Sequence, residues 1–141
     1  MGIQRAEPAQ AQSPGLVSGE CELRSYEQLR SQELALGQRV VHVVRALIAC
    51  PDGSWIRSDE ATHYGASGLN VFRGSVVYQT VEWRLEGEEL RVDPLGGGRL
   101  SSDLPFALML ASEQRTVRGV CFRSDAGFRN FRIQGEEPCE L

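Results

Sequence analysis

The chain has 141 residues, of which 41% are hydrophobic and 24% are charged, and its formal net charge at pH 7 is −4. This length suits one domain with one core. The acidic balance argues against a nucleic-acid partner, because phosphates require a basic surface. No apolar run approaches the roughly 20 residues of a membrane span, and residues 1–15 lack the basic and apolar blocks of a signal peptide. We therefore expect a cytoplasmic protein without a membrane partner.

The N-terminal segment differs in composition from the rest of the chain. Residues 1–18 contain mainly Ala, Gln, Pro, Ser and Gly, which predicts a flexible arm ahead of one domain at residues 19–141. Residues 20–36 fit both an alternating strand and a loose helical stripe. We expect a first strand there, followed by a turn or a short helical piece, and leave open whether this segment forms a lid.

The most apolar stretch of the chain is residues 39–50. Its many β-branched residues favour a buried strand over a helix. Residues 51–54 (Pro-Asp-Gly-Ser) have the composition of a turn between antiparallel strands. Residues 55–64 would then form the return strand, and the Gly- and Ser-rich residues 65–68 a loop.

Residues 75–85 alternate as a strand does, because successive side chains point to opposite faces. One predicted face carries Val77, Gln79, Val81 and Trp83, and the other carries Val76, Tyr78 and Thr80. Residues 86–88 (Glu-Gly-Glu) predict a tight hairpin into the next strand. Further strands are expected at residues 104–111, 117–122 and 128–133. Seven or eight short antiparallel strands at this spacing predict an all-β barrel or sandwich.

The sequence offers little catalytic or metal-binding chemistry. Four cysteines are widely spaced, without a C-x-x-C pair: Cys21, Cys50, Cys121 and Cys139. This spacing does not predict a zinc site. In a reducing cytoplasm they are expected to be small apolar fillers or exposed thiols, with their pairing left open. A Cys–His nucleophile pair using His42 or His63 is an alternative that lacks a third residue.

Two polar residues stand out within predicted buried strands. His42 lies inside a run of valines, and Gln79 is in line with Val77 and Val81. A buried amide without hydrogen bonds costs about 1–3 kcal/mol, so Gln79 suits the carbonyl of a ligand. A core glutamine paired with neighbouring backbone is an equally good interpretation.

The chain also resembles a known family. The resemblance lies in five segments, residues 36–38 (Leu-Gly-Gln), 51–53 (Pro-Asp-Gly), 85–90 (Leu-Glu-Gly-Glu-Glu-Leu), 118–120 (Arg-Gly-Val) and 127–133 (Gly-Phe-Arg-Asn-Phe-Arg-Ile). They are similar to the opening strand, hairpin and closing strands of the allene-oxide-cyclase-like barrels, a calycin architecture. Within that group the chain looks like the small bacterial spirotetronate cyclases of polyketide antibiotic biosynthesis.

The resemblance implies an antiparallel eight-stranded β-barrel with an apolar cavity, often in a homodimer. Such a cyclase folds a linear polyketide-derived diene–dienophile for an intramolecular Diels–Alder (4+2) cycloaddition, an isomerisation that needs no cofactor or metal. Gln79 matches the position where some members carry tyrosine near the dienophile carbonyl, which makes it the expected catalytic residue. The expected substrate-binding residues are His42, Val77, Tyr78, Val81, Trp83, Met109, Phe131 and Ile133.

Two other functions remain open beside the leading cyclase hypothesis. A lipocalin-like carrier would bind an apolar small molecule in the same cavity without altering it. A cavity-free β-domain would instead bind a partner through its surface. A filled interior would favour this last hypothesis.

Overall fold

The computed structural model describes residues 21–93, 99–125 and 132–134. The expected flexible arm at residues 1–18 lies outside these residues. So do Phe131 and Cys139.

The described residues form eleven strands and one three-residue 3-10 helix. The strands are β1 (Glu22–Ser25), β2 (Gln28–Glu33), β3 (Arg39–Ala49), β4 (Trp55–Tyr64), β5 (Asn70–Gln79), β6 (Trp83–Asp93), β7 (Arg99–Ser102), β8 (Phe106–Leu110), β9 (Arg115–Gly119), β10 (Cys121–Ser124) and β11 (Arg132–Gln134). The helix η1 (Ala35–Gly37) joins β2 to β3. No helix in the described part of the chain has the length and apolar character to span a membrane.

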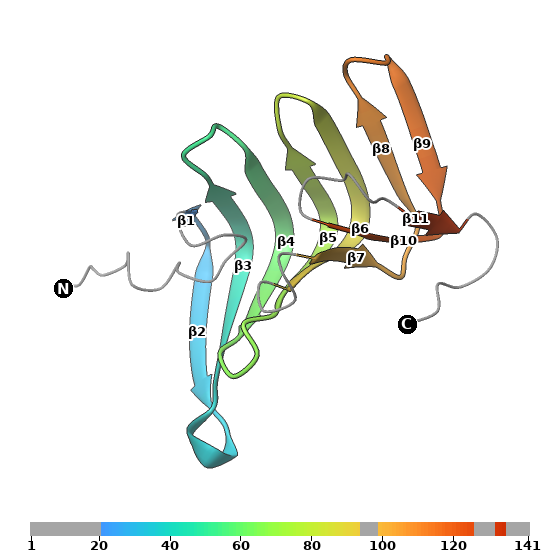
Figure 1. Ribbon diagram of the computed structural model, residues 1–141. Coiled ribbons are helices and arrows are strands. Elements are labelled where there is room, and N and C mark those ends of the chain that lie inside the picture. The colour runs from blue at the N-terminus through green and yellow to red at the C-terminus, as the bar shows by residue number, and fades with distance from the viewer. Residues whose placement is uncertain (1–20, 94–98, 126–131, 135–141) are drawn as a thin grey trace.

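All strand pairs are antiparallel and belong to one sheet (Figure 1). Strands β3, β4, β5 and β6 lie side by side at its centre, and β1 and β2 both pair with β3. The two ends of β6 pair with different strands, since β8 and β9 continue the sheet from one end and β7, β10 and β11 from the other. This confirms the predicted all-β antiparallel fold.

The predicted eight-stranded barrel does not form within the described residues. Strands β1 and β2 form one edge of the sheet, and neither pairs with β9 or β11 at the far ends. In Figure 1 the β2 edge and the β9 edge lie on opposite sides of the molecule. Periodicity reports which residues form strands, but closure depends on pairing between the first and last strands, which no local pattern encodes.

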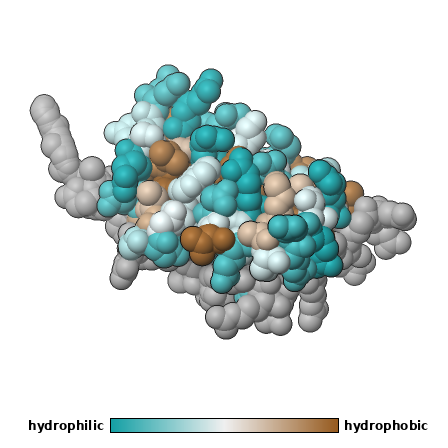
Figure 2. Space-filling view, turned by 90° about the horizontal axis from the view of Figure 1, so that it is seen from above, coloured by the Kyte–Doolittle hydropathy of each residue, from teal (hydrophilic) through white to brown (hydrophobic). Residues whose placement is uncertain are grey.

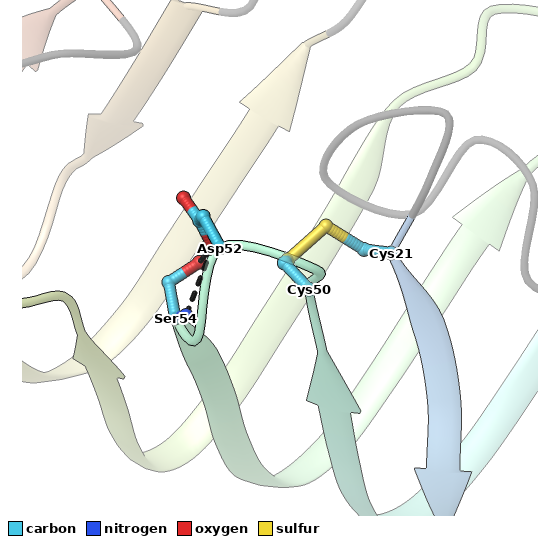
Figure 3. Close-up of a disulfide and its surroundings, with 4 residues drawn as sticks. All are labelled: Cys21, Cys50, Asp52 and Ser54. Atoms are coloured by element: carbon cyan, nitrogen blue, oxygen red, sulfur yellow. Dashed lines mark hydrogen bonds between the residues drawn. A yellow bond between two sulfur atoms is a disulfide. The ribbon is translucent and has the colours of Figure 1, made fainter.

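The strands and turn predicted between residues 39 and 68 are confirmed by β3, β4 and the loop that follows them. The β3–β4 turn is closed by hydrogen bonds from the Cys50 N–H to the Ser54 carbonyl oxygen and from the Gly53 N–H to the Cys50 carbonyl oxygen. Asp52 Oδ1 accepts hydrogen bonds from the Ser54 hydroxyl at 2.7 Å and the Ser54 N–H at 2.9 Å (Figure 3). These bonds lower the pKa of the Asp52 carboxyl, the hydroxyl contributing most.

The hairpin predicted at residues 86–88 is wrong, because the chain turns at residues 80–82 instead. The Thr80 hydroxyl oxygen accepts hydrogen bonds from the backbone N–H groups of Glu82 and Trp83, both at 3.1 Å. A threonine hydroxyl thus stabilises the turn without the Gly, Asn or Asp that usually signals one. Gly87 lies inside β6, where an added Cβ would come within 3.2 Å of the Pro105 carbonyl oxygen. The glycine taken as a turn signal therefore permits close approach of β8.

One face of the sheet carries the hydrophobic core. A cross-strand row of core residues runs through Ile48, Ile56, Tyr78, Leu85 and Leu108, all buried. The largest fully buried side chains include Phe72 and Phe122, and the Phe122 ring packs edge-on against Phe106 at 4.8 Å between centroids. In the described part of the chain, these large side chains pack together on the face where the core lies.

Bulges in the central strands change the alternation of buried and exposed residues. Arg45 and Ser75 have φ of 59° and 48°, and the register shifts between Arg73 and Val76 where β5 meets β6. Val43 and Ala46 are therefore both buried although they are three positions apart, which in a regular strand would place them on opposite faces. A bulge of this kind bends a strand and cannot be located from hydrophobic alternation alone.

The three described cysteines are in disulfides, whereas the sequence predicted apolar fillers or exposed thiols. Cys21 and Cys50 form a disulfide with their Cα atoms 4.0 Å apart, which links the start of β1 to the end of β3 (Figure 3). Cys121 is also disulfide-bonded. The described cysteines therefore lack the free sulfur that a nucleophile requires, and the Cys–His alternative is wrong for them.

Candidate binding surface

The face of the sheet opposite the core carries two parallel rows of side chains across six strands. The first row is Ala49, Trp55, Gln79, Arg84, Met109 and Thr116, each opposite the next on the neighbouring strand. The second row is Leu47, Arg57, Val77, Glu86, Ala107 and Arg118. We call these two rows the Trp55 face. Directly opposed residues in antiparallel strands share a face, so the register alone places these residues together.

The centre of the Trp55 face combines an aromatic ring with an arginine. The Arg57 guanidinium carbon lies 5.6 Å from the centroid of the Trp55 ring, within the range of a cation–π contact. Val77, the next residue in the Arg57 row, is only 7% exposed although it points away from the core. No carboxylate among the described residues forms an ion pair with Arg57. The Arg57 guanidinium is therefore not neutralised by any described carboxylate.

Gln79 is engaged on both sides of its amide. Its Nε2 donates to the Thr80 carbonyl oxygen at 2.8 Å, and its Oε1 accepts from Arg84 Nη1 at 2.9 Å. Arg84 Nε donates in turn to Glu86 Oε2 at 2.7 Å. This geometry favours the interpretation of Gln79 as a satisfied structural glutamine. Its catalytic role stays a prediction.

Two open grooves lie on the Trp55 face, and Arg84 lines both. The larger groove has a volume of about 580 Å³, and its lining includes Arg45, Arg57, Asp59, Val77, Glu86 and Glu88. The smaller groove has a volume of about 310 Å³, and its lining includes Gln79, Trp83, Met109, Arg115 and Thr116. The smaller volume is at the lower limit of ordinary small-molecule sites.

The structure brings together only part of the predicted substrate-binding set. Val77, Gln79 and Met109 share the Trp55 face. Tyr78 and Trp83 belong to the buried core, where their rings pack edge-on with centroids 4.7 Å apart. Trp83 also reaches the lining of the smaller groove.

The other predicted residues lie apart from this group. Val81 is 87% exposed in the β5–β6 turn. The prediction that it shares a strand face with Trp83 is therefore wrong. Ile133 lies on β11, opposite Phe122 of β10. Phe131 falls outside the described residues.

His42 lies on β3, beside a separate groove of about 630 Å³ that no other predicted substrate-binding residue lines. Its Nδ1 is 3.1 Å from the Thr62 hydroxyl, and its Nε2 is 4.0 Å from Glu60 Oε1. The second histidine, His63, is hydrogen-bonded through Nδ1 to Asn70 Oδ1 at 2.7 Å. His63 is thus hydrogen-bonded as a structural histidine would be.

The tips of three hairpins, β3–β4, β5–β6 and β8–β9, point to the same end of the molecule (Figure 1). Figure 2 views the molecule from that end and shows a mostly hydrophilic surface with isolated hydrophobic residues. Scattered apolar residues of this kind are ordinary on a protein surface. The hairpin tips therefore do not form an apolar docking patch.

No protein-family model matches this chain, and no match was found among curated proteins. The resemblance to spirotetronate cyclases therefore stays a prediction.

Glu86 on the Trp55 face is paired, and Tyr78 in the core behind that face is buried. Glu86 is held by Arg84, and no group of three metal-binding side chains occurs in the described part of the chain. Burial, with a smaller effect from the Asp52 charge, raises the pKa of Tyr78 to about 12. Tyr78 therefore stays protonated at neutral pH.

The sequence interpretation missed Trp55, Arg57 and Arg84 as site residues. Trp55 and Arg57 are two positions apart in a strand that was predicted, so their common face was readable from the period of two. Arg84 was not readable in this way. Its position opposite Gln79 depends on the turn at residues 80–82, which lacks an ordinary turn signal.

Proposed function

We propose that this chain is a non-catalytic β-domain that binds a protein partner through the Trp55 face. The observation that carries the proposal is the combination of Trp55, Arg57 and Met109 on one face of the sheet, where Arg57 is exposed and Trp55 and Met109 are half-buried, while the opposite face carries the core. Trp, Arg and Met are enriched at protein–protein interfaces, and Trp and Arg dominate their binding energy.

The cyclase and carrier hypotheses both require an interior cavity that holds an apolar ligand. The described core side chains, among them Phe72, Ile48 and Leu85, occupy that interior. Gln79 lies on the outward face with its amide already hydrogen-bonded, so it does not present a free donor to a substrate carbonyl. These contacts favour the surface-binding hypothesis over the other two.

We also propose that the domain works in an oxidising compartment. The Cys21–Cys50 disulfide and the disulfide-bonded Cys121 support this, since disulfides persist outside the reducing cytoplasm and are rare within it. The cytoplasmic expectation rested on the N-terminal composition and remains the alternative. A homodimer likewise remains a prediction.

A site-specific crosslink tests the docking surface. A photoreactive amino acid placed at Thr116, an exposed residue on β9 in the Trp55 row, leaves Trp55 and Arg57 intact and should capture one protein from the source cells, whereas the same group at Arg99 on β7 should not. The captured protein is then purified, and its affinity for the unmodified domain is measured by calorimetry. We expect Trp55→Ala and Arg57→Ala each to weaken binding at least tenfold, as at interface positions that dominate affinity. Arg99→Ala is the matched control.

A parallel assay tests the enzyme and carrier hypotheses. The pure protein is incubated with linear polyenes that carry a tetronate group, and the mixture is examined by native mass spectrometry and product chromatography. We expect neither a complex nor an isomer of unchanged mass. A new isomer whose formation depends on Gln79 would overturn the proposal in favour of the cyclase, and a stable complex without conversion would favour the carrier.

A further inference from the structure

Strand β9 ends the sheet on the side of β8, and its outer edge is open within the described part of the chain. It pairs only with β8, through the five residues of Arg115–Gly119. In Figure 1, β9 lies on the outer side of the β8–β9 hairpin, away from β6. Alternate residues of an edge strand point their backbone N–H and C=O groups away from the sheet. The edge of β9 therefore has the hydrogen-bonding groups that one further strand requires.

The charged side chains of β9 are all positive. Arg115 and Arg118 are both exposed, and the strand contains no acidic residue. Arg115 is partly neutralised by Glu113 of the preceding turn, whose Oε1 lies 3.1 Å from Arg115 Nη2. No described carboxylate forms an ion pair with Arg118. The whole chain has a formal net charge of −4, so its overall composition does not account for this positive edge.

The two faces of β9 differ in character. Arg118 and Thr116 lie on the Trp55 face, opposite Ala107 and Met109 of β8. Val117 points to the other face, where it is half-buried against the hydrophobic core. A strand added to β9 would lie about 4.8 Å away, and its side chains would alternate in the same way. They would meet Arg118 on one face and Val117 on the other, so the complementary strand alternates acidic and apolar residues.

The same charges disfavour a second copy of this chain as the occupant of the edge. Two β9 strands paired across a two-fold axis would bring four arginines together, and like charges on facing strands are destabilising. At the opposite end of the sheet, β1 and β2 carry charges of both signs, with Glu22 and Arg24 on β1 and Arg30 and Glu33 on β2. Of these three edge strands, β9 is therefore the one whose charges select an acidic strand.

We propose that the edge of β9 binds an extended segment of the protein partner by strand addition, with an acidic side chain opposite Arg118 and an apolar one opposite Val117. Backbone hydrogen bonds to the added strand contribute affinity, and the alternating side chains contribute specificity. The added strand extends both rows of the Trp55 face by one position, because Thr116 and Arg118 end these rows. The inference rests on the proposed function, since it describes how the protein partner joins that face.

A set of matched peptides tests the inference without the partner. The probe is a seven-residue peptide, capped at both ends, in which glutamate and valine alternate, and its control has lysine in place of each glutamate. Binding is measured by NMR titration, and hydrogen exchange follows the backbone amides of β9. We expect the glutamate–valine peptide to bind more tightly than the lysine–valine peptide and to slow the exchange of these amides.

Two N-methylated peptides separate strand addition from attraction between charges alone. One carries an N-methyl group on every glutamate, and the other carries one on every valine. Only one of these two sets of N–H groups faces β9 in an added strand, because successive N–H groups point to opposite edges of a strand. One N-methylated peptide should therefore lose binding, while the other keeps it.

Two substitutions on β9 assign the acidic side chain to one face. Arg118→Gln should weaken binding of the glutamate–valine peptide roughly threefold, as expected for an exposed charge pair. Arg115→Gln removes the same charge from the same strand and should leave the affinity nearly unchanged, because Arg115 lies on the other face. Arg118→Lys should restore most of the affinity. Circular dichroism of each variant verifies that the sheet is retained.

Three results would overturn the inference. The first is a glutamate–valine peptide that binds no more tightly than the lysine–valine peptide, and the second is equal binding of both N-methylated peptides. The third is Arg115→Gln weakening binding as much as Arg118→Gln. If the exchange of β9 amides slows as the protein concentration rises without peptide, the occupant is instead a second copy of the chain.

The outcomes also separate this inference from the proposed function. If the peptides give any of the overturning results while the protein captured at Thr116 still depends on Trp55 and Arg57, strand addition fails and the Trp55 face stands. If the glutamate–valine peptide binds as expected and no protein is captured, the edge of β9 binds acidic strands and the proposed function fails.

Discussion

Removing the Cys21–Cys50 disulfide should cost the protein a large part of its stability. The bond closes a loop with a sequence separation of 29, for which the chain-entropy relation yields about 3.6 kcal/mol at 25 °C. Domains of this size have a free energy of unfolding of only about 5–15 kcal/mol. The double variant Cys21→Ala/Cys50→Ala should therefore stay folded but have a much lower free energy of unfolding. With an unfolding entropy of roughly 2.1 cal/mol/K per residue over 141 residues, Tm should fall by about 12 °C.

Calorimetry and hydrogen exchange measure this effect at two levels. The double variant is preferable to chemical reduction, because a reductant would also open the disulfide of Cys121. Global stability is measured by calorimetry, and local opening by the exchange of backbone amides in β1. Strand β1 has four residues and pairs only with β3 in the described part of the chain, so it should lose protection first. A Tm loss below about 3 °C, or unchanged protection of β1, would refute the reasoning.

Two further predictions concern the core. Tyr78→Phe should abolish an alkaline weakening of the fold. The pKa of Tyr78 is raised to about 12 in the folded protein, against about 10 in the unfolded chain. The stability that comes from this difference is therefore fully present below pH 10 and is lost as the pH rises through the folded value. Urea titrations should give the original protein about 1.4 kcal/mol less stability at pH 11 than at pH 9, a difference that the variant lacks; equal losses in both would contradict this. Phe72→Ala should cost about 3–5 kcal/mol, since the ring is 0% exposed within the core. A loss under about 1 kcal/mol in a urea titration would indicate a loosely filled interior and would reopen the cavity hypotheses.

Much of the secondary structure was predictable from residue patterns. The β-branched run became β3, the Pro-Asp-Gly-Ser segment became its turn, and residues 55–64 became β4 with the predicted bounds. The hairpin after β5 was misplaced because a threonine hydroxyl closes the turn at residues 80–82, while the expected turn glycine, Gly87, accommodates β8. Because of that error, Trp83 was predicted on the wrong face, and the pairing of Gln79 with Arg84 was not predicted.

The site was predictable only where two residues lie on one strand. Val77 and Gln79 were expected on a common face, and they do share one. The expectation that this face is the interior is wrong, because Tyr78, on the alternate face, belongs to the core cluster. A half-apolar strand has two candidate core faces, and the choice depends on which neighbouring rows pack against it.

Local chemistry in the amino-acid sequence determined the all-β antiparallel fold class and most strand positions, because alternation and turn composition act over a few residues. Tertiary structure decided the rest, namely the open sheet, the Cys21–Cys50 disulfide and the grouping of Trp55, Arg57 and Arg84 on one face. Each of these depends on the register between strands or on bulges such as the one at Gly74 and Ser75. Register is set by the packing of the whole sheet, and a shift of one residue exchanges its two faces.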